Sequence, residues 1–175
     1  MENIAIKDLV EKKIGKGRRE FIKIKGWFQI KHIRDGKVID TRNILNTVTN
    51  AGFAEIAGLI NSDEAGSLTS FDYIAIGTGT TVAAVTQTEL VTEITTGGGE
   101  RRGGSDVTGS RTTTTVTNDT SQWETTFTFT SSFAVTECGL FNASSNGTML
   151  CRQIFSAINV ASGDTITFTW KIQVA

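Results

Sequence analysis

Regular alternation of apolar and polar residues through the last third of the chain restricts the folds open to it. In residues 122–130 and 165–174, aromatic or β-branched side chains alternate with threonine and charged or amide side chains. This period of two indicates strands with one buried face and one wet face. Residues 133–140 and 149–157 form two further expected strands, joined by a turn-rich segment. The sequence therefore predicts an antiparallel β-sandwich or jelly-roll-like domain.

Size and composition favour a single domain. A chain of 175 residues is long enough for one substantial core and short for two. Only 38% of the residues are apolar and proline is absent, which suits a wet-faced antiparallel sheet. We expect residues 21–175 to form this domain. Residues 1–20 are predicted to be a basic N-terminal arm, and residues 95–111 a flexible, glycine-rich loop.

The charge is unevenly divided along the chain. Residues 1–46 hold 12 Lys and Arg against 6 Asp and Glu, whereas the remainder holds 5 against 12. The overall charge of −1 argues against specific nucleic-acid binding. A basic front and an acidic body could attract each other between copies and favour a homo-oligomer. The alternative is that the asymmetry reflects chance and solubility.

The predicted contact residues lie in the arm and in the glycine-rich loop. Residues 4–13 carry apolar side chains at helix-like intervals, and a segment this short is expected to order only when docked. We favour partner docking over nucleic-acid binding for the basic stretch 12–19, because no aromatic platform lies nearby. The candidate contact residues are Lys12, Lys13, Lys16, Arg18, Arg19, Arg101 and Arg102.

The middle of the chain predicts a hairpin and one or two short helices. Asp35-Gly36 is a favoured two-residue turn, so residues 21–33 and 38–45 should pair. Asn50 could cap a helix over residues 50–61, with Phe53, Ile56, Ala57 and Ile60 on its packing stripe. A capping-box match at residues 86–89 suggests a helical turn over 87–94. Residues 71–77 and 112–117 are expected strands.

The C-terminal hairpin can be aligned residue by residue. A turn centred between Ser144 and Ser145 would place Cys138 opposite Cys151, and Glu137 opposite Arg152. Opposite charges and like apolar groups then coincide, which supports this register. We favour free, adjacent thiols over a disulfide, because the lack of a signal peptide pattern indicates synthesis in a reducing cytosol.

The sequence offers little for catalysis or cofactor binding, and we predict that the protein is not an enzyme. His32 is the single histidine, and the acidic residues form no local pair, so neither a metal site nor a catalytic triad is indicated. The Gly77-Thr-Gly79 turn lacks the lysine of a phosphate-binding loop. No cofactor or metal is expected, and no apolar run is long enough to span a membrane.

Several motifs resemble a family of tailed-bacteriophage virion proteins. They are Ile74-Ala-Ile-Gly-Thr-Gly-Thr-Thr, Phe133-Ala-Val-Thr-Glu-Cys-Gly-Leu-Phe-Asn142 and Gly163-Asp-Thr-Ile-Thr-Phe-Thr-Trp170. The resemblance covers residues 46–175 and excludes the basic arm. Because the motifs consist of strand and turn residues, the resemblance concerns fold more than chemistry.

The resemblance implies a virion structural protein that is assembled in the host cytoplasm. A capsid decoration (cement) protein, bound to the major capsid protein through its arm and to its own copies, is the first expectation. The alternative is an adaptor in the tail fibre, collar or baseplate. A weaker alternative is a carbohydrate-binding module, for which Trp27, Trp123 and Trp170 would have to be surface residues rather than core residues.

Overall fold

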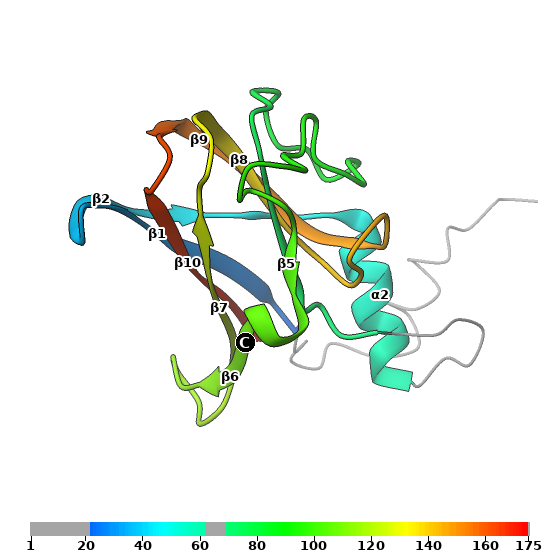
Figure 1. The fold of residues 1–175 in the computed structure, drawn as a ribbon. Helices are drawn as coiled ribbons and strands as arrows, with labels where there is room; N and C mark the ends of the chain where they lie inside the picture. The colour runs from blue at the N-terminus through cyan, green and yellow to red at the C-terminus, as the bar shows by residue number, and fades with distance from the viewer. Residues whose placement is uncertain (1–21, 62–68, 175) are drawn as a thin grey trace, which may run out of the picture.

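Two five-stranded antiparallel sheets pack face to face in this protein (Figure 1). The computed structural model describes residues 22–61 and 69–174. A shared core between the sheets contains aromatic and aliphatic side chains from both layers. The predicted antiparallel β-sandwich is therefore confirmed. The predicted arm, residues 1–20, lies outside the described residues.

The first sheet joins the N-terminal hairpin to the C-terminal strand. Its order is β2 (Lys37–Leu45), β1 (Ile24–Arg34), β10 (Thr165–Val174), β7 (Thr120–Thr128) and β6 (Thr108–Thr112). Alternation directs Phe28, Phe168 and Trp170 into the core, where each is fully buried. Asp35 and Gly36 both adopt positive φ, as a two-residue hairpin turn requires, so the predicted hairpin is confirmed.

The second sheet is buried on both faces along its central strands. Its order is β3 (Thr47–Val48), β9 (Met149–Val160), β8 (Phe133–Phe141), β4 (Tyr73–Gly77) and β5 (Arg102–Gly103). The inner face contributes to the shared core. On the outer face, Leu90 packs with Ala75, Phe141 and Met149 in a small second core. Figure 1 shows the green segment that follows β4 folded back over this sheet. This segment, residues 78–101, is called the covering segment below.

Helix α2 (Asn50–Asn61) packs against β9 through only part of the predicted stripe, because Ile56 alone of its members packs against the core. Phe53 and Ile60 are exposed, whereas Gly52 is buried directly against the Leu150 main chain. A Cβ atom at Gly52 would collide with that main chain, so glycine permits the close approach. The N-cap side chain is also different: the amide of Gly52 donates to the Thr49 hydroxyl at 2.9 Å.

Three local predictions differ from the structure between β4 and β7. Residues 87–94 form turns and a bridge to Gly77 rather than a helix. The strand expected at 112–117 lies earlier, at β6, because the Asp119 carboxylate accepts the amides of residues 114–116 and folds them into a loop. The expected flexible loop 95–111 contains β5, the 3-10 turn η1 (Gly104–Asp106) and most of β6. Its mobility remains a prediction.

The predicted register of the β8–β9 hairpin is wrong by two residues. Glu137 is opposite Ile154, and Cys138 is opposite Gln153. The connecting loop spans residues 142–148, closed by Asn142, and a bulge follows Leu140, which together displace the strands. A shift of two preserves the faces, so Cys138 and Cys151 remain diagonal neighbours. Both are buried free thiols, as expected, and burial raises the pKa of each.

Candidate functional site

A fully buried ion pair lies at the centre of the largest polar cluster. Arg152 Nη2 and Nε donate to Glu137 Oε2 at 2.6 and 2.9 Å, and both side chains are 0% exposed. Because the register differs by two, the predicted Glu137–Arg152 pair forms across a diagonal rather than between opposite residues. A buried pair of this kind is stable only when its remaining hydrogen-bonding capacity is also satisfied.

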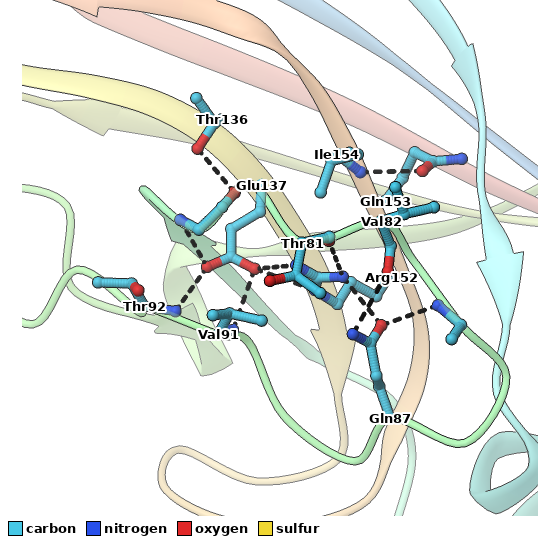
Figure 2. Close-up of polar contacts among 12 residues, drawn as sticks. Thr81, Val82, Gln87, Val91, Thr92, Thr136, Glu137, Arg152, Gln153 and Ile154 are labelled. Atoms are coloured by element: carbon cyan, nitrogen blue, oxygen red, sulfur yellow. Dashed lines mark hydrogen bonds and ion pairs between the residues drawn. The ribbon is translucent and has the colours of Figure 1, made fainter.

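The covering segment satisfies the Glu137 carboxylate (Figure 2). The amides of Gly79 and Thr92 donate to Oε1 at 3.0 and 2.7 Å, and the amide of Val91 donates to Oε2 at 3.1 Å. The Thr136 hydroxyl also donates to the Gly79 carbonyl oxygen. The glycine-threonine turn therefore does bind an anion, but the anion is a carboxylate of the same chain. The Gly79 amide is therefore bonded to a group of its own chain.

Arg152 extends the cluster to the other end of the covering segment. Its Nη1 donates to the Thr81 carbonyl oxygen at 3.0 Å and to Gln87 Oε1 at 2.9 Å. Gln87 Oε1 also accepts the amide of Ala84. These contacts explain why the capping-box match at 86–89 does not start a helix: the Gln87 side chain closes a turn and binds Arg152 instead.

The two predicted arginines of the glycine-rich loop have different surroundings. Arg101 forms a bidentate pair with Glu93 and lies 3.9 Å above the Phe141 ring, which leaves 8% of its side chain exposed. Arg102 retains more exposure and lies 3.6 Å from Asp106. Arg101 therefore anchors the covering segment to the sheet. Contact of Arg101 or Arg102 with a partner remains a prediction.

A second buried polar cluster joins the first and last strands. Arg34 Nη2 and Nε bind the Asp164 carboxylate at 2.6 and 2.8 Å, and His32 Nε2 lies 3.0 Å from Asp164 Oδ2. Hydrogen bonds from Arg34, with further ones from the Ala161 amide and His32, hold the pKa of Asp164 well below its usual range. The structure thus gives His32 a structural partner that the sequence pattern did not reveal.

An apolar groove opens beside helix α2, outside both polar clusters. Its apolar lining, called the apolar groove below, comprises Ile24, Trp27, Leu45, Val48, Phe53 and Val85. Leu45 is 74% exposed, Phe53 47% and Val85 45%. The sequence pattern did not indicate this surface, because Phe53 was assigned to the packing face of the helix.

The three tryptophans have different surroundings in the structure. Trp170 is fully buried and Trp123 packs against the core, whereas Trp27 borders the apolar groove. Lys12, Lys13, Lys16, Arg18 and Arg19 lie outside the described residues. Within residues 22–61 and 69–174, no cluster of three His, Cys, Asp or Glu side chains could hold a metal ion. No described helix has the length and hydrophobicity needed to span a membrane.

These features define an antiparallel β-sandwich whose buried ionic groups fasten its loops and which exposes Leu45, Phe53 and Val85 at one apolar groove. Comparison with models of protein families, with curated proteins and with solved structures found no match to this chain.

Proposed function

We propose that this protein is a structural protein of a tailed-phage virion that acts by association rather than catalysis. The observation that carries the proposal is the contact between two of the motifs that resemble phage virion proteins. The Gly77-Thr-Gly79 turn and the strand around Glu137 are bonded to each other through the Glu137 carboxylate and the Thr136 hydroxyl. The motif residues thus have a scaffolding role, which fits a subunit that must be rigid.

Two further observations support an associative role. Glu137, Arg152 and Asp164 are all engaged in internal ion pairs that hold strands or loops. Leu45, Phe53 and Val85 of the groove are exposed instead, and contiguous apolar surface marks interaction sites. Among virion positions we favour capsid decoration, with contacts to the major capsid protein and to neighbouring copies. A tail-fibre, collar or baseplate adaptor is the second candidate.

The copy number of the protein in purified virions tests this proposal. Quantitative mass spectrometry of gradient-purified particles should find the chain in stoichiometric amounts relative to the major capsid protein. A few copies per particle would favour the tail adaptor. Absence from particles, with abundant protein in the infected cell, would contradict the virion proposal.

Binding to undecorated heads separates decoration from the other roles. We expect full-length protein to bind such heads saturably, and deletion of residues 1–19 to weaken binding. Undiminished binding would remove the arm from the mechanism. Glycan binding by the isolated protein, without head binding, would favour the carbohydrate-binding alternative.

A further inference from the structure

The apolar groove has the chemistry of a binding site for an apolar peptide segment. Its exposed apolar side chains come from three elements, Leu45 from β2, Phe53 from α2 and Val85 from the covering segment, and the exposed Lys25 of β1 also lines it. The amide of Asn50 donates to the Val85 carbonyl oxygen at 2.8 Å, so the helix and the covering segment are held together at the groove. The wall is therefore fixed before a partner arrives, which lowers the entropic cost of binding.

The groove also contains an unsatisfied polar group. Asn46 borders the groove, and neither its side-chain oxygen nor its nitrogen has a hydrogen-bond partner, although both are shielded from solvent. A shielded amide without partners is unfavourable. A main chain entering the groove could supply both a donor and an acceptor after a small rotation of this side chain. A peptide fits this requirement better than a purely hydrocarbon ligand does.

The N-terminal segment of the chain matches the groove in its apolar pattern. Ile6, Leu9 and Val10 recur at intervals of three and four residues, the spacing of anchors that enter apolar grooves. The chain also enters the sandwich beside this surface, because Ile24, the first residue of β1, is part of the groove lining.

Charge complementarity also supports the N-terminal segment as the ligand of the groove. The basic stretch 12–19 follows the apolar residues directly and contains five Lys and Arg. Lys25 lines the groove itself, but two elements that border it, helix α2 and residues 78–94, contain no Lys or Arg and carry Glu55 and Glu89, besides Glu93, which is paired with Arg101. A segment placed in the groove could therefore bring its basic residues near acidic neighbours.

The same charges favour docking in the groove of a second copy over docking in the groove of the segment's own copy. To return to its own groove, the chain would have to reverse direction within residues 14–23. That reversal would crowd Lys16, Arg18 and Arg19 into a tight turn, and like charges at short distance repel, whereas an extended connection to a neighbour keeps them apart. The ten residues between Lys13 and Ile24 can span about 35 Å when extended, enough to reach a neighbour.

We infer that residues 4–13 of one copy dock in the apolar groove of a second copy of this chain, with Ile6, Leu9 and Val10 against Leu45, Phe53 and Val85. This inference rests on the proposed function, for which it supplies the contact between copies. Each copy both donates a segment and offers a groove, so the contact is suited to linking several copies.

Two full-length variants separate the donor from the acceptor. The variant Ile6→Asp/Leu9→Asp disables the segment and keeps the groove, whereas Leu45→Asp/Phe53→Asp disables the groove and keeps the segment. Val116→Asp is the matched control, because Val116 is an exposed apolar residue outside the groove. Circular dichroism and the melting temperature of each variant verify folding.

Sedimentation velocity over a range of concentrations gives the readout. The unmodified protein and the control should self-associate, and each double variant alone should associate at least tenfold more weakly. An equimolar mixture of the two variants should recover a dimer, since one intact segment can then meet one intact groove. A monomeric unmodified protein, a groove variant that associates normally, or a mixture that stays monomeric would overturn the inference.

These outcomes are independent of the proposed function. A protein that is stoichiometric in virions but monomeric in solution would contradict the docking between copies and leave the virion role intact. A protein that self-associates through the groove but is absent from virions would contradict the virion role alone.

Discussion

The covering segment and the groove end of the molecule use their side chains in opposite ways. The covering segment has almost no regular secondary structure, yet charged hydrogen bonds from Glu137, Arg152 and its own Arg101 hold it to the second sheet and to the loop 142–148, and its own Leu90 is buried. The groove end consists mainly of regular elements, β1, β2 and α2, with Val85 of the covering segment added, yet it leaves Leu45 and Phe53 exposed. Regular secondary structure therefore does not identify the part of this molecule whose polar groups are bonded within the chain.

This difference has a physical origin. A segment without a hydrogen-bonded ladder must satisfy its amides by other means, and the Glu137 carboxylate accepts three of them. A helix satisfies its main chain internally and a strand through its neighbours in the sheet, so their outward side chains are available for other contacts. We therefore expect changes in the covering-segment cluster to affect folding, and changes in the groove to affect association.

The largest effect is expected from breaking the buried ion pair. Glu137→Gln leaves the Arg152 guanidinium buried without its counter-charge, which should lower the free energy of unfolding by about 3–5 kcal/mol. Urea denaturation measures this change. Glu124→Gln, at an exposed position on β7, is the control and should cost less than about 0.5 kcal/mol. Equal stability of the two variants would show that the pair does not hold the segment.

A smaller loss is expected at Gly98 of the covering segment. Gly98 has φ of 86°, and a Cβ atom there would collide with the Thr128 carbonyl oxygen. Gly98→Ala should therefore destabilise the protein by about 1–3 kcal/mol. Gly109→Ala is the matched control, because Gly109 has no atom near its Cβ position and no positive φ. Equal melting temperatures for the two variants would contradict tight packing of the covering segment at Gly98.

The Asp164 cluster predicts a pH-dependent contribution to stability. Because Arg34 lowers the pKa of Asp164 in the folded state, its carboxylate stabilises the fold above the unfolded pKa of about 3.9. This contribution is lost as the pH falls through the folded pKa. Asp164→Asn should therefore be clearly less stable than the unmodified protein at pH 7, with a smaller difference near pH 3. Urea denaturation at both pH values checks this, and a constant difference would contradict it.

The smallest effect on stability is expected in the groove. Leu45 is largely exposed, so Leu45→Ser should change the free energy of unfolding by less than about 0.5 kcal/mol. The same variant should weaken self-association, because it removes an apolar contact. Urea denaturation and sedimentation of the same sample measure both quantities. A large loss of stability with unchanged association would reverse the roles assigned to the two regions.

The sequence predicted the sandwich because alternation is a local signal that survives packing. The strands over 122–130 and 165–174, the Asp35-Gly36 hairpin and helix α2 all follow from patterns within about ten residues. The β8–β9 register could not be obtained in this way, because a bulge after Leu140 and a seven-residue loop are invisible to a pairing rule. Their effect depends on how Asn142 closes the loop.

The site was only partly predictable for a similar reason. Pairing by charge identified Glu137 and Arg152 as partners, although in the wrong register. Nothing in the pattern indicated that Glu137 would accept amides from residues 79, 91 and 92, which are distant in sequence. The groove was missed because Gly52, rather than Phe53, contacts β9, and a close main-chain approach leaves no hydrophobic signal.

Hydroxyl-radical footprinting of the full-length protein at low and high concentration tests the contrast between the two regions most directly. Leu45 and Phe53 should be oxidised in dilute protein and protected in concentrated protein, as association covers the groove. Leu90 of the covering segment and Phe141 beneath it should stay protected at both concentrations. Equal oxidation of Leu45 and Phe53 at every concentration, or surface-like oxidation of Leu90 and Phe141, would contradict the account.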